Sequence, residues 1–251
     1  MNPKPPCIAL FDLDHTLLPI DSDHEWGRFL ARLGVVDPLY YQQENERFYR
    51  AYKEGTLDID AFLQFALKPL KDHQKSTLDQ WHEQFMSEVI EPQIRKEAIG
   101  LVNHHLVKGD ICCIVTDTNS FVTRPIAKRF GIDQLIATEP ETMLLQDKIQ
   151  FTGRVHGAPN FKEGKVVHVQ NWLRKLGYEW QSLQESIFYS DSMNDLHLQV
   201  EFLLEADERN HDFRIHWNLL LGDISSRFED RSSLHLRDFR IRNTQTATAV
   251  T

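Results

Sequence analysis

The sequence predicts an α/β fold built on a doubly wound parallel sheet, and three apolar runs are the main reason. Each run is short, continuous and ends at a polar residue: Cys7–Phe11 at Asp12, Ile111–Val115 at Thr116, and Ser186–Ser190 at Asp191. Such runs are typical of strands buried on both faces of a parallel sheet. Segments of helical periodicity separate them, as the crossovers of parallel strands require. Because the carboxyl ends of parallel strands meet at one edge, we expect the polar residues to gather there.

A helical insertion is predicted between the first and second strands. From about residue 23 to residue 86, apolar side chains recur at helical spacing, and glycines separate the segments. We therefore expect residues 21–90 to form a helical cap. Residues 1–20 and 91–200 would then form a Rossmann-like core.

The predicted core continues by alternation of helix and strand. Helices are expected over residues 99–106, 121–130 and 164–176, a short strand over 134–137 and a hairpin over 142–155. After Leu196 lysine disappears: 12 Lys and 9 Arg lie up to this point, and 7 Arg and no Lys follow it. We expect residues 201–251 to be an atypical, partly disordered segment that arises from an altered reading frame or a divergent extension. Loss of the last strand would leave the sheet with an unprotected edge.

Charge and apolar pattern exclude several classes of protein. The 28 basic and 37 acidic residues give a formal net charge of −9, and no basic cluster that would bind nucleic acid is present. No apolar run approaches the roughly 20 residues that cross a bilayer, and the N-terminus lacks the layout of a signal peptide. We therefore expect a cytoplasmic protein that binds neither nucleic acid nor membrane. The oligomeric state stays open.

The cysteines and histidines have ordinary structural explanations. Three cysteines cannot form a disulfide framework, and Cys112 and Cys113 lie in an apolar run, which favours burial. The histidines of the predicted helices, among them His82 and His105, share no ligand spacing. Exposed helical positions are expected for them.

Two carboxylates follow the first strand at a spacing that suits acid–base chemistry. Asp12 and Asp14 are two residues apart, so strand alternation aims both toward the same side. One could act as a nucleophile and the other as a general acid and base. An acidic turn that caps a helix is the alternative.

The residues after the other strands suit a metal ion and a phosphate group. Asp191 and Asp195 offer the oxygen ligands that Mg²⁺ prefers, or else they stabilise a helix N-terminus. The Thr116 hydroxyl and the backbone N–H groups of Asp117 and Thr118 could hold phosphate oxygens. Lys165, at a helix start, is either a fixed positive charge or a solvated surface lysine.

Four motifs therefore follow one another along the chain. They are Asp12-Leu13-Asp14-x-Thr16, the strand-end Thr116, Gly164-Lys165, and Asp191-Ser192-x-Asn194-Asp195. In order and approximate spacing they resemble the motifs of the haloacid dehalogenase superfamily. More narrowly, residues 7–196 are similar to its phosphoserine-phosphatase-like branch, subfamily IB, which carries a helical C1-type cap between the first two motifs.

The resemblance implies a phosphatase that hydrolyses a small phosphomonoester through an aspartyl-phosphate intermediate. In that reaction Asp12 attacks phosphorus. Asp14 protonates the leaving alcohol and then deprotonates the attacking water. Thr116 and Lys165 hold the phosphoryl oxygens, with Lys165 also offsetting the charge around Asp12.

The resemblance also implies a Mg²⁺ cofactor. The ion would be held by the Asp12 carboxylate, the backbone carbonyl of Asp14, and Asp191. Asp195 and Asn194 would support the metal and phosphate site.

Substrate choice is expected to lie in the cap. In phosphoserine phosphatases an acidic residue nine positions after the nucleophile contacts the substrate ammonium, and this offset corresponds to Asp21. The resemblance thus favours an amine-bearing phosphomonoester such as histidinol phosphate or phosphoserine, although Asp21 could equally cap the first cap helix. The alternative function is a catalytically impaired phosphate-binding protein with an altered C-terminus. A receiver domain also combines Asp, Thr and Lys, but it lacks a helical insertion of this size.

Overall fold

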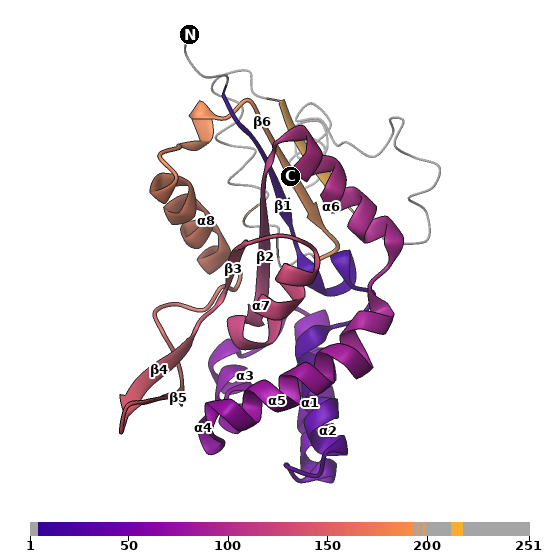
Figure 1. Ribbon diagram of the computed structural model, residues 1–251, viewed down its shortest axis with the longest axis vertical. Helices are drawn as coiled ribbons and strands as arrows, with labels where there is room; N and C mark the ends of the chain where they lie inside the picture. The colour runs from indigo at the N-terminus through magenta and orange to yellow at the C-terminus, as the bar shows by residue number, and fades with distance from the viewer. Residues whose placement is uncertain (1–4, 193–194, 196–197, 199–211, 218–251) are drawn as a thin grey trace, which may run out of the picture.

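The computed structural model is an α/β protein built around one parallel sheet (Figure 1). The structure describes residues 5–192, 195, 198 and 212–217. Five strands run in the order β3-β2-β1-β6-β7, and each neighbouring pair is parallel. Their bounds are Gln134–Thr138 for β3, Ile111–Asn119 for β2, Cys7–Phe11 for β1, Glu185–Ser190 for β6 and Asp212–Trp217 for β7. The predicted parallel sheet is therefore present.

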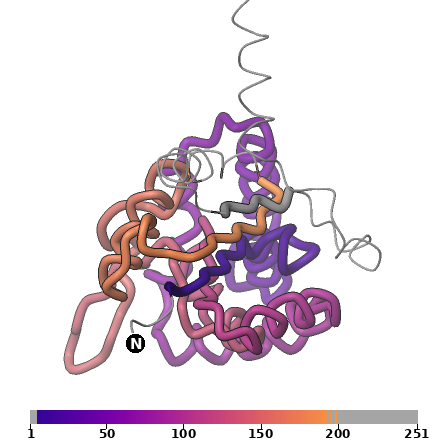
Figure 2. The backbone as a smooth tube through the Cα atoms, turned by 90° about the horizontal axis from the view of Figure 1, so that it is seen from above, coloured from indigo at the N-terminus to yellow at the C-terminus, as the bar shows by residue number. Residues whose placement is uncertain are grey.

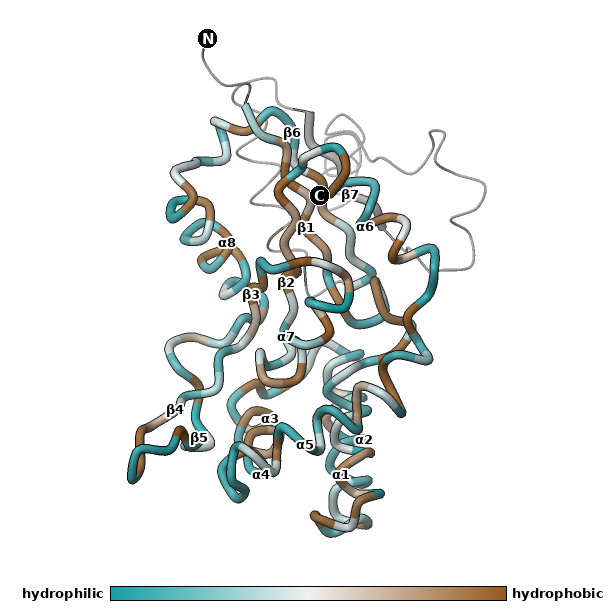
Figure 3. The backbone as a smooth tube through the Cα atoms, viewed as in Figure 1, coloured by the Kyte–Doolittle hydropathy of each residue, from teal (hydrophilic) through white to brown (hydrophobic). Residues whose placement is uncertain are grey.

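Helices cover both faces of this sheet. They are α6 (Lys96–Lys108), α7 (Ser120–Arg129) and α8 (Glu163–Lys175). Alternate residues of β1 serve the two faces, since Ala9 and Phe11 belong to the hydrophobic cluster of α6 and α7, and Ile8 and Leu10 to that of α8. All four side chains are fully buried. Figure 3 shows the hydrophobic colour running along the inner strands, as expected for strands covered on both sides.

The cap consists of five helices between β1 and α6. They are α1 (Ser22–Arg32), α2 (Pro38–Lys53), α3 (Ile59–Ala66), α4 (Lys68–Asp72) and α5 (Lys75–Phe85). Three of them begin at an aspartate, Asp21, Asp37 or Asp58, whose side chain accepts a hydrogen bond from the backbone N–H three residues later. Figure 1 shows the cap beyond the edge of the sheet at which β1 and β2 end.

The predicted hairpin is formed by β4 (Pro140–Leu145) and β5 (Lys148–Val155). The packing of this hairpin against the cap was not predicted. Strand β5 packs against α3, α4 and α5, and Phe151 is buried in one cluster with Leu63 and Leu70 of the cap. A segment between two core elements thus completes the hydrophobic core of the cap. Figures 1 and 2 show the far end of the hairpin extending away from the body of the molecule.

The C-terminal segment supplies the fifth strand. Strand β7 pairs with β6 along all six residues from Glu185 to Ser190, so β6 is not the unprotected edge that loss of a last strand would have left. The remainder of residues 201–251 lies outside the described residues. No helix in the described part of the chain is long and apolar enough to cross a membrane.

Burial of Cys112 and Cys113 is confirmed, but the expected exposure of two histidines is wrong. Cys112 and Cys113 are both buried. His82 is 4% exposed, with Nε2 2.9 Å from a backbone carbonyl oxygen of α7. His105 is 2% exposed, and its ring nitrogens lie 2.7 Å from Asp110 Oδ2 and 2.8 Å from the Tyr189 hydroxyl. Hydrogen bonds to residues far away in the sequence offset the cost of burying these two rings. The local sequence pattern does not reveal such partners.

Candidate active site

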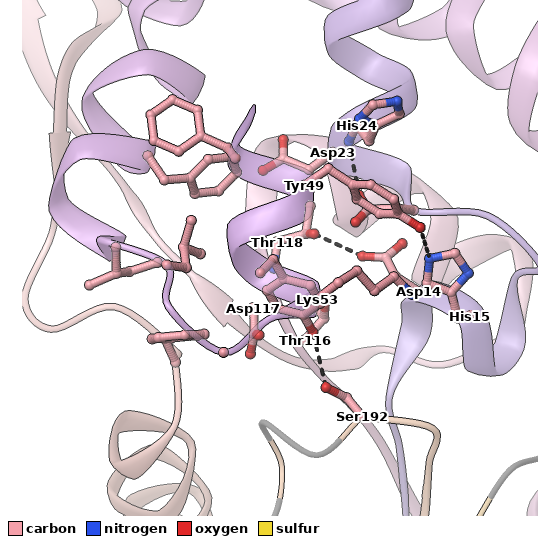
Figure 4. Close-up of a pocket in the computed structure, with 18 of the residues that line it drawn as sticks. Asp14, His15, Asp23, His24, Tyr49, Lys53, Thr116, Asp117, Thr118 and Ser192 are labelled. Carbon is pink, nitrogen blue, oxygen red and sulfur yellow. Dashed lines mark hydrogen bonds between the residues drawn. The ribbon is translucent and has the colours of Figure 1, made fainter. Parts of the chain in front are cut away.

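A cavity of about 360 Å³ lies between the sheet and the cap. Its core wall contains Asp12, Thr116 and Asp191 from the carboxyl ends of three strands, and its cap wall comes from α1, α2 and α3. In the view of Figure 4, Asp23 and His24 lie at one end of the cavity and Ser192 at the other. The expected gathering of polar residues at one sheet edge is therefore present.

Asp12 and Asp191 converge on the hydroxyl of Thr16. Thr16 Oγ1 lies 3.2 Å from Asp191 Oδ1 and 3.4 Å from Asp12 Oδ2, and it accepts a 3.2 Å hydrogen bond from the Asp191 N–H. Thr16 reaches this position because a tight turn, Leu13–Leu17, follows the first strand. Burial raises the pKa of both carboxyl groups. A cation placed between them would relieve that cost.

The donor set fits a hard divalent cation. Asp12 and Asp191 offer only carboxylate oxygens, and Mg²⁺ typically takes one or two protein carboxylates together with water and phosphate oxygens. The described residues contain no group of three or more His, Cys, Asp or Glu side chains that could hold a metal ion. The described residues therefore suit a cation that binds two carboxylates and completes its coordination with oxygens of water or phosphate.

Lys165 is buried among three carboxylates. Its Nζ lies 2.7 Å from Asp117 Oδ1 and 3.8 Å from Asp12 Oδ1, and it also pairs with Asp195. Burial alone would lower the pKa of Lys165, but the three carboxylates outweigh burial and raise it, so the amine keeps its charge. The surface-lysine alternative is wrong, because this side chain is 1% exposed. The other oxygen of Asp195 accepts a 2.6 Å hydrogen bond from Ser190, so both its oxygens are engaged.

The Asp14 carboxylate accepts hydrogen bonds from both the cap and the core. The Ser22 N–H donates to Oδ1 at 2.7 Å, and the Thr118 hydroxyl donates to Oδ2 at 2.8 Å. Burial, followed by the charge of Asp21, raises the pKa of Asp14 to about 6. A carboxyl group with a pKa near neutrality can both give and take a proton at physiological pH.

We expect Asp14→Asn to stabilise the metal-free protein at pH 7. The pKa of about 6 in the fold lies above the value of 3.8 for an unperturbed carboxyl, so the contribution of Asp14 to stability is full below pH 3.8 and is lost as the pH rises through 6. After allowance for weakened hydrogen bonds, the expected gain at pH 7 is about 1–2 kcal/mol. Urea unfolding in EDTA at pH 4 and pH 7 measures it. A difference between variant and wild type that is the same at both pH values would contradict the prediction.

Strand β2 leaves regular pairing at the site. Its register with β3 shifts between Val115 and Asn119, which releases the intervening residues from the ladder. The buried Asn160 side chain donates to Thr116 O at 2.7 Å and fixes this bulge. The Thr116 hydroxyl accepts a 3.2 Å hydrogen bond from the Thr118 N–H. The bulge is the reason why β2 extends beyond its predicted end.

The start of α1 adds two carboxylates to the cavity wall. Asp21 is the N-cap of α1, and its Oδ1 accepts a 2.9 Å hydrogen bond from the His24 N–H, so the capping alternative for Asp21 describes the structure. Asp23 accepts a 3.4 Å hydrogen bond from Asn119 Nδ2. Burial raises the pKa of both carboxyl groups.

Two tyrosines of α2 close the cap onto the core. The Tyr52 hydroxyl lies 3.2 Å from Ser192 Oγ, and the Tyr49 hydroxyl lies 3.3 Å from His15 Nε2 (Figure 4). One contact reaches the loop after β6 and the other the turn after β1. These two contacts hold α2 of the cap against the core wall of the cavity.

The structure brings most of the predicted site residues together. The cavity is lined by Asp12, Asp14, Asp21, Thr116, Asp117 and Asp191. Lys165 and Asp195 contact this set from the buried side. Asn194 lies outside the described residues.

Sequence reasoning missed the residues that orient these side chains. They are Ser22, Asn119, Asn160, Ser190 and the hydroxyl of Thr118, each of which bonds a carboxylate or a backbone oxygen of the site. Ser190 and Thr118 carried a weak signal, since each lies within two residues of a motif residue. Asn160 carried none, because its partner is 44 residues away.

Comparison with known proteins agrees with this geometry. The family model for haloacid dehalogenase-like hydrolases matches residues 9–198. The chain belongs to the haloacid dehalogenase-like hydrolase family. The fold and the family expected from the sequence are therefore confirmed.

Two relatives carry names of phosphatases, which confirms the enzyme class expected from the sequence. A histidinol-phosphatase of Neisseria meningitidis serogroup C (strain 8013) is 42% identical over 191 residues, which cover 76% of this chain and 85% of the relative. Phosphoserine phosphatase SerB1 of Mycobacterium tuberculosis (strain ATCC 25618 / H37Rv) is 29% identical over 191 residues, 75% of this chain and 60% of that protein.

Solved structures share the fold. The crystal structure of a protein with unknown function from Bordetella pertussis Tohama I has 41% sequence identity and a TM-score of 0.72, over 84% of this chain and 98% of that chain. A substrate-bound phosphoserine phosphatase has a TM-score of 0.56 over 96% of this chain and 99% of that chain. At 15% identity, the second likeness shows the fold alone.

Proposed function

We propose that this member of the family is a Mg²⁺-dependent phosphatase that hydrolyses histidinol phosphate through an aspartyl-phosphate on Asp12. The observation that carries the proposal is the convergence of Asp12 and Asp191 on one hydroxyl, with the Lys165 amine 3.8 Å from Asp12. Phosphoryl transfer depends on positioning and charge neutralisation more than on covalent assistance. This cavity offers groups for both tasks.

The protein groups divide the reaction as follows. An Asp12 oxygen forms a bond to phosphorus while the bond from phosphorus to the ester oxygen breaks, and Asp14 gives its proton to that oxygen. Asp14 then takes a proton from the water that attacks the aspartyl-phosphate, which releases inorganic phosphate and restores Asp12. The pKa of about 6 supports Asp14 in both steps. Lys165 and the Thr116 hydroxyl bind phosphoryl oxygens.

Asp12, Asp191 and the backbone carbonyl of Asp14 would hold Mg²⁺. When bound, the cation supplies positive charge that offsets the phosphate dianion and the surrounding carboxylates. Asp195 is assigned a different task from the metal binding expected from the sequence. Because its oxygens are engaged by Lys165 and Ser190, we propose that it holds the Lys165 amine in position.

The charge of the cavity favours histidinol phosphate over phosphoserine. Phosphoserine carries a carboxylate, which needs a cationic partner. The described residues that line the cavity include no arginine, and their one lysine, Lys53, is exposed. The wall offers Asp21 and Asp23 for a cation, and the aromatic rings of Phe48 and Phe62 for an apolar group. The Neisseria relative, 42% identical, is named a histidinol-phosphatase.

Release of inorganic phosphate tests the proposal. Purified protein is assayed with histidinol phosphate, phosphoserine and p-nitrophenyl phosphate, with Mg²⁺ and with EDTA. We expect kcat/KM for histidinol phosphate to exceed that for phosphoserine by about tenfold or more, because an unpaired substrate carboxylate is costly to bury. Removal of the metal is expected to lower turnover by more than about 100-fold, and added Mg²⁺ should restore it.

Each deviation from this pattern has a distinct meaning. Preference for phosphoserine would overturn the substrate while leaving the reaction intact. Full turnover in EDTA would overturn the metal requirement. Absence of turnover from folded protein, with binding of inorganic phosphate retained, would favour the alternative of a catalytically impaired phosphate-binding protein.

A further inference from the structure

We propose that Asp23, rather than Asp21, binds the ammonium group of the substrate and sets the preference for phosphate esters of 2-amino alcohols. This inference rests on the proposed function and assigns a residue to its substrate specificity. Three features of the cavity wall carry it: the occupation of Asp21, the surroundings of Asp23, and the position of Asp23 relative to the reacting groups.

Asp21 already has a structural partner. It is the N-cap of α1, and its Oδ1 accepts the His24 N–H at 2.9 Å. The second backbone hydrogen bond that lowers its pKa comes from the Asp23 N–H. A carboxylate that satisfies the free N–H groups of a helix end has less capacity left for a ligand. The acidic residue nine positions after Asp12 is therefore already engaged as the N-cap of a helix.

Asp23 is half-buried and has fewer hydrogen-bond partners than Asp21. Among the described residues, its side chain accepts one long hydrogen bond, 3.4 Å, from Asn119 Nδ2. No ion pair to Asp23 is present among the described residues, and the charged groups that act on it are the carboxylates of Asp21 and Asp14. Burial and these like charges raise the pKa of Asp23. A carboxyl group in such surroundings gains more from an incoming cation than one that is already paired.

Asn119 fixes the direction of the Asp23 side chain. Asn119 Oδ1 accepts the Val122 N–H at 3.2 Å as the N-cap of α7, so its Nδ2 is held toward Asp23. This contact joins the cap to the bulged end of β2. Asp23 is therefore positioned by the core, although it belongs to the cap.

Asp23 is also at a suitable place for an amine close to the phosphate ester. Its neighbour in α1, Ser22, donates its N–H to Asp14 at 2.7 Å, and Asp14 and Asp23 line the same cavity. In a 2-amino alcohol phosphate, two carbon atoms separate the ester oxygen from the nitrogen. Asp14 would then contact the ester oxygen. Asp23, the residue after Ser22 in α1, would contact the ammonium group.

A pair of substrates that differ only in the amine tests the inference. Histidinol phosphate is compared with the phosphate ester of 3-(imidazol-4-yl)propanol, which lacks the ammonium group. We define the amine preference as the ratio of kcat/KM for the two esters and measure it, with Mg²⁺ present, for wild type, Asp23→Asn and Asp21→Asn. Asparagine preserves an N-cap almost as well as aspartate, so Asp21→Asn removes the neighbouring charge without removing the cap. Melting temperatures establish that each variant is folded.

Asp23→Asn is expected to lower the amine preference by about 10- to 100-fold, the range for loss of a hydrogen bond to a charged group. Asp21→Asn is expected to change it by less than about threefold. A preference in Asp23→Asn equal to that of wild type, or a collapse in Asp21→Asn alone, would overturn the inference while the proposed function stands. If wild type hydrolyses neither ester, the proposed function itself fails. If it hydrolyses both equally well, no ammonium is recognised and the inference fails.

Discussion

Asp12→Asn is expected to lower kcat by on the order of 10⁴-fold or more while the protein stays folded. In the proposed mechanism an anionic oxygen of Asp12 attacks phosphorus, and the amide lacks this oxygen, so no aspartyl-phosphate would form. The same change removes a buried carboxyl whose pKa is raised by burial, so the melting temperature of the metal-free variant should equal or exceed that of wild type. Phosphate release and thermal unfolding measure the two effects.

A charge-matched control separates the nucleophile from net charge. Asp133 is exposed, and Asp133→Asn changes the net charge by the same amount without touching the cavity. Acid quenching with ³²P-labelled substrate adds a direct readout, because wild-type protein should retain label and Asp12→Asn should not. Turnover by Asp12→Asn within tenfold of wild type would show that another group, or water itself, attacks phosphorus.

Lys165→Met is expected to cost both stability and activity. The methionine side chain has a similar length, but it leaves buried Asp195 and Asp12 and half-buried Asp117 with no cation. Removing one partner of a buried ion pair typically costs about 3–5 kcal/mol. The free energy of unfolding, measured by urea denaturation at pH 7 in EDTA, should fall by that amount. Phosphatase turnover should be lost as well, since the phosphoryl group loses a binding partner.

Two comparisons locate the effect in the charge cluster. Lys175→Met lies in the same helix at an exposed position and should change stability by less than about 0.5 kcal/mol. The double variant Lys165→Met/Asp117→Asn should recover part of the lost stability, because it removes one of the uncompensated carboxylates. If the double variant is less stable than Lys165→Met, the ion-pair explanation is wrong.

The sheet and the main site residues could be predicted because their signals are local. A buried strand of a parallel sheet is readable as a continuous apolar run, and its carboxyl end then locates Asp12, Thr116 and Asp191 on one edge. Lys165 was placed beside them only by the resemblance of the four motifs to a known family, because taken alone it also suited a solvated surface position. The strand-end predictions needed only the positions of the apolar runs, which are local features of the sequence.

The remaining features depend on contacts between distant segments. The burial of His105 requires Asp110 and Tyr189, and 84 residues separate the histidine from the tyrosine. The assignment of Asp21 as a helix cap and of Asp23 as the less compensated carboxylate depends on hydrogen-bond geometry at α1, which the spacing of acidic residues does not contain. Proximity in sequence to the nucleophile was a poor guide to these roles.

The packing of the β4–β5 hairpin limits how the cap can be exchanged by engineering. The cap helices are contiguous in sequence, which suggests a module that could be cut out and replaced to change specificity. Phe151 of β5, however, is buried among Leu63, Leu67, Leu70 and Leu78 of that module. Removing the helical segment alone would leave the Phe151 ring exposed on the remaining core. The excised helices would in turn have a cavity where that ring had packed. The transferable unit is discontinuous: five helices together with a hairpin that follows them more than fifty residues later in the chain.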